Sequence, residues 1–243
     1  MKRLFLAIEG NEAAGKSFLV DAVRAWAESQ SKRALDLVAF GAKHHRLPLP
    51  EELDGFDILL SREPSPAWIG EAIRWEFVQR DARPYSGKEI AEAFALDRLV
   101  LYRRVLIPAF ERGMVVCSDR SVASSIVYQP ITEPDPLSLE EIISLPGNHL
   151  ALEYGPTHLV VVLADPHEAA GRIAERTHKQ DNARFEVLPF MQKLDERYRA
   201  PWFQTFWQSR GAHISLLDTS HTDTSQTQHE AQKIITSILS TSL

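Results

Sequence analysis

The feature that most constrains this chain is a glycine-rich loop between an apolar run and an amphipathic segment near the N-terminus. The run Leu4-Phe-Leu-Ala-Ile precedes Gly10-Asn-Glu-Ala-Ala-Gly-Lys-Ser17, which fits G-x-x-x-x-G-K-[ST] without a gap, and helical periodicity continues to about Gln30. In a strand–loop–helix unit, backbone N–H groups and the helix N-terminus cradle phosphate oxygens. The pattern predicts a nucleoside triphosphate site. A simple glycine turn that caps a helix is the alternative interpretation.

Two residues of the loop carry specific chemistry. Lys16 is expected to neutralise charge on the β- and γ-phosphates, and Ser17 is expected to offer its hydroxyl to Mg²⁺. The predicted ATP-binding segment consists of Gly10, Asn11, Glu12, Ala13, Ala14, Gly15, Lys16, Ser17 and Phe18.

Further apolar runs alternate with helical patterns along the rest of the chain. Besides the first strand and a helix from Lys16 to about Gln30, strands are expected near 57–61, 114–118, 158–163 and 212–217, and helices near 89–111, 166–176 and 230–239. Pro108 is expected to bend or end the long helix. Buried strands that alternate with helices predict an α/β fold, a three-layer α/β/α sandwich with a mostly five-stranded parallel sheet. Ligands of such sheets bind at the carboxyl ends of the strands.

Length and composition bound the class of protein. The 243 residues are expected to form one domain, 1–243, with two insertions at about 41–57 and 130–156. A net charge of −6 argues against a general nucleic-acid or anionic-membrane binder. The single cysteine, Cys117, allows no intrachain disulfide, and no apolar run approaches the length of a membrane span. We therefore expect a cytoplasmic protein.

Charged residues follow two of the predicted strands. Arg62 and Glu63 come directly after the second strand, and Pro64 forces an extended exit there. Asp119 and Arg120 follow the next strand, where a carboxylate can hold Mg²⁺ or its water and an arginine can clamp a phosphate. A surface ion pair at each place is the alternative interpretation.

Two helical segments carry further candidates. Phe94 and Arg98 are four residues apart and share a face, which suits stacking and hydrogen bonding to a planar base. The alternative is a core phenylalanine beside an Asp97–Arg98 surface pair. Arg172 and Arg176 share a face of a helix that leads into a polar loop, and arginines on such loops can close over phosphates. The alternative there is a solvated helix face.

Taken together, these segments resemble the thymidylate kinase family over most of the chain and in the expected order. The segment from Ile8 to Ser17 resembles its phosphate loop, Arg62-Glu-Pro its R-E-P segment, and Phe94-Ala-Leu-Asp-Arg98 its F-x-x-D-R helix. The most specific match is Asp119-Arg-Ser-Val-Ala-Ser-Ser-Ile-Val-Tyr-Gln129, which resembles its D-R-Y-x-x-S-x-x-A-Y-Q run. The segments 158–166 and 182–186 resemble its fourth strand and the D-R-F-E after its lid.

The resemblance implies a P-loop nucleoside monophosphate kinase that converts ATP and dTMP to ADP and dTDP, with Mg²⁺, as a homodimer. It implies catalytic roles for Lys16, Arg120, Arg172 and Arg176, with a lid at about 172–186. It implies metal binding by Ser17 and Asp119. The implied acceptor-binding residues are Glu12, Arg62, Phe94, Arg98, Arg120, Ser125 and Gln129. Because the acceptor is already an anion, no strong general base is required.

Departures from the family pattern leave other acceptors open. Ser121 stands in place of a tyrosine that helps exclude a 2′-hydroxyl, Ala13 in place of a frequent glycine, and Ser65-Pro-Ala in place of G-G-T. A deoxynucleoside kinase is the main alternative, because Glu63-Pro-Ser-Pro-Ala-Trp68 resembles its E-P-x-x-x-W, whose glutamate is the base for a 5′-hydroxyl. Ser124 and Tyr128-Gln129 favour the monophosphate kinase. Other nucleotide kinases, or a nucleotide-binding protein without activity, remain as further alternatives.

Overall fold

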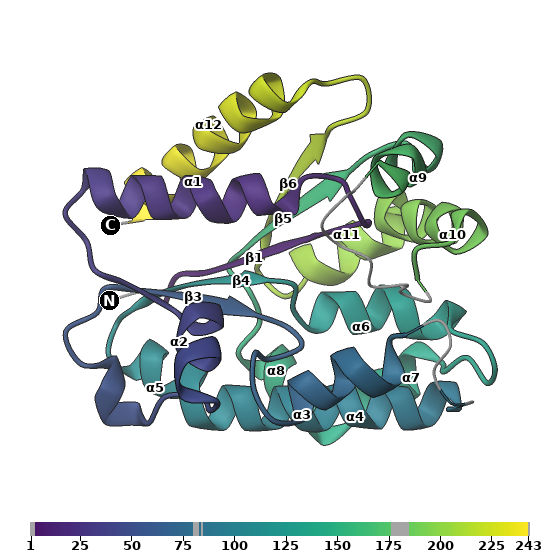
Figure 1. Cartoon of the computed structure of the whole chain (residues 1–243), viewed down its shortest axis with the longest axis horizontal. Helices are drawn as coiled ribbons and strands as arrows, with labels where there is room; N and C mark the ends of the chain where they lie inside the picture. Colours follow the sequence, from purple (N-terminus) through teal and green to yellow (C-terminus); the bar gives the residue numbers. More distant parts are fainter. Residues whose placement is uncertain (1–2, 80–82, 84, 176–184, 243) are drawn as a thin grey trace.

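A computed structural model (Figure 1) describes residues 3–79, 83, 85–175 and 185–242. Its centre is a six-stranded sheet in the order β2-β3-β4-β1-β5-β6, in which each neighbouring pair is parallel. The strands are β1 (Phe5–Gly10), β2 (Ala34–Asp36), β3 (Ile58–Arg62), β4 (Val115–Asp119), β5 (His158–Leu163) and β6 (His213–Asp218). The predicted parallel α/β sheet is confirmed.

Helices cover both faces of this sheet. One face carries α1 (Lys16–Ser29) and α12 (Thr224–Ser242), which pack side by side. The other helical segments are α2 (Leu37–His44), η1 (Pro50–Leu53), α3 (Ile69–Ala72), η2 (Ile73–Phe77), α4 (Gly87–Leu101), η3 (Tyr102–Leu106), α5 (Ile107–Glu111), α6 (Val122–Tyr128), η4 (Gln129–Ile131), α7 (Leu139–Ser144), α8 (Pro146–Glu153), α9 (Pro166–Ala174), α10 (Leu188–Arg199) and α11 (Pro201–Gln208). No helix in the described ranges is both long enough and apolar enough to cross a membrane.

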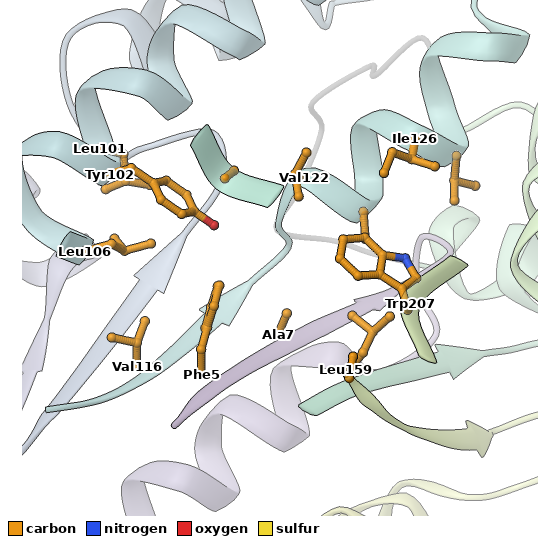
Figure 2. Close-up of a cluster of buried hydrophobic side chains, with 14 of the residues drawn as sticks. Phe5, Ala7, Leu101, Tyr102, Leu106, Val116, Val122, Ile126, Leu159 and Trp207 are labelled. Atoms are coloured by element: carbon orange, nitrogen blue, oxygen red, sulfur yellow. The ribbon is translucent and has the colours of Figure 1, made fainter. Parts of the chain in front are cut away.

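The alternation of side chains along β1 explains the two layers of core. Leu6 and Ile8 point to the face covered by α1 and α12, whereas Phe5 and Ala7 point to the opposite face. Figure 2 shows the second face, where Phe5 and Ala7 lie among side chains from α4, η3, α6 and α11, including Tyr102 and Trp207. Because both faces are buried, the strand is apolar at every position except its last two, Glu9 and Gly10.

The sequence-based boundaries of the expected strands agree with the structure, whereas the last helix begins at Thr224 rather than at 230, and α2, α3, α6, α10 and α11 were not expected. The sheet has six strands rather than mostly five, because β2 is only three residues long and too short to show a period. Pro108 was expected to bend or end its helix, yet helical structure continues to Glu111. The π-helical turn η3 precedes this proline and widens the backbone ahead of a residue that lacks an N–H group.

The two predicted insertions are not simple loops. Residues 41–57 include the end of α2 and the short η1 helix, and residues 130–156 contain α7 and α8. Helix α8 packs directly on α4: a Cβ atom on Gly147 would overlap the carbonyl oxygen of Ala95. Gly147 is therefore fixed by a close approach of two backbones, and α8 lies against the helix that carries Phe94 and Arg98.

The strand register brings the motifs to one edge of the sheet. Ile8 and Arg62 both lie opposite Asp119, and Gly10 lies opposite Val162. The phosphate loop after β1, the Arg62-Glu63 pair after β3 and Arg120 after β4 therefore meet at the carboxyl edge, where ligands of parallel sheets bind.

Candidate active site

The phosphate loop is fixed by its glycines and by one buried amide. Gly10 and Gly15 have φ angles of 130° and 97°, and a Cβ atom on Gly10 would overlap the carbonyl oxygen of Val162. The Asn11 side chain donates to the carbonyl of Ala164 over 2.9 Å and accepts from its N–H group over 3.2 Å. These contacts tie the loop to the end of β5 and leave its backbone to form the cradle.

Within the loop, Lys16 lies across the backbone. Its Nζ atom donates to the carbonyl oxygens of Asn11 at 2.7 Å and Gly10 at 3.3 Å. Loss of water around the ammonium group and the nearby Arg120 lower the pKa of Lys16 to about 8, against the opposite pull of carboxylates that include Glu12. A phosphate group bound in the loop would therefore stabilise the charged form of Lys16.

The remaining loop residues divide between packing and exposure. Ala14 is fully buried and its carbonyl accepts from the Thr219 hydroxyl, while Phe18 packs against the core under α1. Ser17 is exposed in the first turn of α1. Ala13 adopts a left-handed φ of 55°, a conformation that favours glycine. Ala14 and Phe18 therefore anchor the phosphate loop to the core under α1.

Arg172 on α9 lies on the side of the phosphate loop next to β6. Its guanidinium donates to the carbonyl of Thr219 over 2.7 Å, to the Thr219 hydroxyl over 3.2 Å and to the carbonyl of Ala13 over 3.4 Å. It also lies 3.5 Å from Glu168, four residues earlier on the helix. Arg172 therefore joins the phosphate loop to the segment after β6. Arg176, the polar loop after it and Arg184 lie outside the described residues.

A cavity of about 150 Å³ opens beside the phosphate loop. The seven predicted acceptor-binding residues all line it, and they come from the loop after β1, the end of β3, α4, the loop after β4, α6 and η4: Glu12, Arg62, Phe94, Arg98, Arg120, Ser125 and Gln129. The sequence-based prediction thus gathered residues from six segments that the fold brings around one space.

Arg120 stands at the boundary between the cavity and the phosphate loop. It forms an ion pair with Glu12, donates to the Ser124 hydroxyl over 3.2 Å and to the carbonyl of Gly10 over 3.4 Å, and lies 5.1 Å from the centre of the Tyr128 ring. Its backbone φ is 73°, in the left-handed region. The guanidinium is thus held from several sides at a place where two phosphate groups could meet.

The surroundings of Asp119 suit a magnesium ion. Its Oδ1 atom is buried and has no hydrogen-bond partner in the described part of the chain, and its Oδ2 atom lies 3.8 Å from Arg62. The carboxylate also lies close enough to Lys16 to raise that lysine's pKa. Mg²⁺ is commonly bound by one or two protein oxygens together with phosphate oxygens. One carboxylate and the exposed Ser17 hydroxyl fit this donor set.

Arg98 is held inside a buried network. Its side chain is 2% exposed, its Nε and Nη2 atoms lie 2.7 and 2.6 Å from Oε2 of Glu63, and its Nη1 atom donates to the side-chain oxygen of Asn148. Burial raises the pKa of the Glu63 carboxyl, and the charge of Arg98 opposes this rise. Asp97 instead accepts from the N–H and hydroxyl groups of Ser65. The alternatives of an Asp97–Arg98 and an Arg62–Glu63 surface pair are therefore wrong.

Comparison with known proteins agrees with this geometry. The family model described as thymidylate kinase matches residues 49–209. The chain belongs to the thymidylate kinase family. A thymidylate kinase from Geobacillus thermodenitrificans is 28% identical over 201 residues, 82% of this chain and 77% of the relative. Another from Lactobacillus delbrueckii subsp. bulgaricus is 27% identical over 222 residues, 90% of each chain. One from Caldicellulosiruptor saccharolyticus is 29% identical over 194 residues, 80% of each.

This thymidylate kinase family member has polar groups around its cavity that sequence reasoning missed. Arg74 on η2 lines the cavity and donates to the backbone carbonyls of Pro64 and Ser65; burial and the nearby Arg62 lower its pKa to about 10. Asn148 lies in a predicted insertion. No motif or periodic pattern in the sequence pointed to Arg74 or to Asn148.

A third missed residue is Glu9, the fully buried penultimate residue of β1. Its carboxylate accepts from the hydroxyls of Ser121 at 2.8 Å, Ser124 at 2.6 Å and Tyr198 at 2.9 Å. Ser121, where this thymidylate kinase family member lacks the usual tyrosine, therefore turns its hydroxyl toward Glu9 and caps α6. The hydroxyl of Ser124 in turn receives the hydrogen bond from Arg120.

Proposed function

We propose that this protein transfers the γ-phosphoryl group of ATP to the 5′-phosphate of dTMP, forming ADP and dTDP. The observation that carries the proposal is a single cavity that is lined by Phe94 and Arg98 and that also reaches Arg120 beside the phosphate loop. An aromatic ring with a guanidinium suits a planar base, and Arg120 suits the phosphate attached to it. The relatives named thymidylate kinase support dTMP as the acceptor.

The chemistry we propose depends on charge and position rather than on a general base. The backbone of the phosphate loop and Lys16 hold the β- and γ-phosphates, while Arg120 and Arg62 hold the acceptor phosphate in line with them. A phosphate monoester already carries most of its second negative charge at neutral pH, so its oxygen can attack without losing a proton to the protein. Arg172, together with Arg176, belongs to the proposed lid over the donor phosphates.

Ser17 and Asp119 are the residues that we propose to hold Mg²⁺. When bound, the ion supplies neutralisation of charge between the β- and γ-phosphates. Around it, the carboxylate of Asp119 lies close to Lys16 and has its Oδ2 atom 3.8 Å from Arg62, so these two cations border the proposed ion site.

A coupled assay for ADP release tests the function. Purified protein is given ATP and Mg²⁺ with dTMP, thymidine, dUMP or a ribonucleotide in parallel, and we expect turnover with dTMP and none with thymidine. Turnover with thymidine but not with dTMP would mean that Glu63 serves as a base in a deoxynucleoside kinase. ATP binding without turnover on any acceptor would identify a nucleotide-binding protein without kinase activity.

The lowered pKa of Lys16 predicts a pH-dependent affinity for ATP. The charged lysine binds phosphate, and with a pKa of about 8 in the free protein it becomes mostly neutral at pH 9. We therefore expect ATP to bind about tenfold more weakly at pH 9 than at pH 7, as measured by calorimetry. Lys16→Arg is the control, because arginine stays charged and should give a flat profile. A flat profile for the unchanged protein would contradict the prediction.

We also propose that residues 1–243 form one kinase domain that works as a cytoplasmic homodimer. Three large apolar side chains on or beside neighbouring helices support a second copy as partner: Trp68, Trp75 and Leu96 are 43%, 77% and 51% exposed. These residues lie on α3, η2 and α4 or directly before them, and these segments pack against one another. Exposed apolar surface commonly marks an interface. Sedimentation velocity tests this assembly, and a species of one 27.5 kDa chain at assay concentration would contradict it.

A further inference from the structure

We propose that Glu63 is a positioning residue that holds Arg98 toward the acceptor base and thereby makes the site prefer pyrimidines with a carbonyl oxygen at C4. This inference rests on the proposed function and assigns to Glu63 a role that is not that of a base. It starts from the fact that a carboxylate and a guanidinium are buried together in the wall of the cavity.

The geometry around Arg98 leaves few of its N–H groups free. One oxygen of Glu63 accepts from Nε at 2.7 Å and lies 2.6 Å from Nη2, and Asn148 accepts from Nη1 on the other side. A guanidinium has five N–H groups in a rigid plane. Within the described part of the chain, the three contacts fix this plane, and N–H groups remain on both terminal nitrogens. Arg98 lines the cavity, so these remaining donors are the ones available to a bound base.

A fixed donor distinguishes bases by what they present at C4. Thymine and uracil carry a carbonyl oxygen there, which accepts a hydrogen bond, whereas cytosine carries an amino group, which cannot accept one. A buried donor left facing an amino group keeps its desolvation cost without a partner. The selectivity therefore depends on how firmly Arg98 is held, and hence on Glu63.

The burial of Glu63 is consistent with this role. The residue is 4% exposed, and its second oxygen, Oε1, has no hydrogen-bond partner in the described part of the chain. Burying a carboxylate is costly unless it is paired, and the ion pair with Arg98 offsets that cost. Removal of the charge on Glu63 should therefore free Arg98 to turn.

The test compares Glu63→Gln with the unchanged protein on three acceptors. We expect kcat/KM to fall by about 10–100-fold for dTMP and by the same factor for dUMP, mainly through KM. We expect kcat/KM for dCMP to change by no more than about threefold. The kcat/KM for ATP, measured at saturating acceptor, should also change by no more than about threefold. A uniform loss on all three acceptors, or no loss on dTMP, would overturn the role proposed for Glu63.

A second comparison separates positioning from a general effect on folding. If Glu63 acts through Arg98, adding Glu63→Gln to Arg98→Lys should cost little more than Arg98→Lys alone, whereas independent effects would multiply. Glu52→Gln is the matched control, because Glu52 also pairs with an arginine, Arg46, through contacts of 2.6 and 2.7 Å away from the cavity. Its activity should be unchanged, and multiplied effects in the double variant would also overturn the role.

These measurements keep the two proposals apart. If the unchanged protein does not phosphorylate dTMP, the proposed function fails before Glu63 is tested. If the unchanged protein is active and Glu63→Gln has the same acceptor preference, only the positioning role fails. A loss confined to kcat with thymidine as acceptor would show instead that Glu63 acts as a base.

Discussion

Replacement of Lys16 by alanine is expected to lower kcat for dTMP phosphorylation by about 1,000-fold or more. The ammonium group lies on the carbonyls of Gly10 and Asn11 at the mouth of the phosphate loop, where charge would develop during transfer of the γ-phosphoryl group. The loop contains no other lysine. Steady-state kinetics with saturating ATP measures the loss.

Lys233→Ala serves as the control for this variant. Lys233 lies on α12 and pairs with Glu230 on the exposed side of the helix, at 2.8 Å. Its loss should therefore change neither activity nor stability beyond about 0.5 kcal/mol. Thermal unfolding shows whether Lys16→Ala keeps its fold. Activity of folded Lys16→Ala equal to that of the unchanged protein would remove Lys16 from the catalytic machinery.

Replacement of Arg120 by alanine is expected to reduce kcat/KM for dTMP by about 1,000-fold. The affinity for ATP should change far less. Its guanidinium is held by Glu12 and Ser124 and stands between the acceptor cavity and the loop. Its removal takes away the cation that lies between the proposed acceptor cavity and the phosphate loop. Initial rates at varied dTMP, together with calorimetric binding of ATP, separate the two effects.

Arg120→Lys should recover part of this activity, because it restores the charge but not a planar fork that can bind two oxygens. Arg112→Ala is the control: Arg112 pairs with Asp54 far from the site and should be dispensable. Equal loss of ATP and dTMP affinity in Arg120→Ala would argue for a general role in the shape of the loop, since Arg120 also contacts the carbonyl of Gly10.

Much of this site could be predicted because its residues stand at the ends of strands. Once a parallel sheet is expected, residues that follow β1, β3 and β4 must meet at one edge, whatever the connections between them. Phe94 and Arg98 could be paired for a similar reason, because the helical period places them on one face. Strand ends and the helical period thus indicated Arg62, Phe94, Arg98 and Arg120, whereas Glu12, Ser125 and Gln129 were predicted to bind the acceptor only through the resemblance to thymidylate kinases.

Residues that depend on contacts between distant elements could not be found in this way. Asn148 is 50 positions from Arg98 and lies in a segment that looked like a proline-rich loop. Glu9 follows an apolar run, and nothing in the neighbouring sequence indicates that three hydroxyl groups from distant segments donate to its carboxylate. Arg74 belongs to a π-helical turn, for which sequence gives no period. Their roles follow from tertiary packing alone.

The contact between α8 and α4 limits how this chain can change. Because Gly147 touches the backbone of Ala95, any side chain at that position would push the two helices apart and withdraw Asn148 from Arg98. The segment 130–156 therefore cannot be shortened or exchanged as a surface addition would be. Among relatives, we expect the length of this segment to vary only in the turn before α7. A foreign loop grafted into this protein should therefore replace that turn and leave α7 and α8 unchanged.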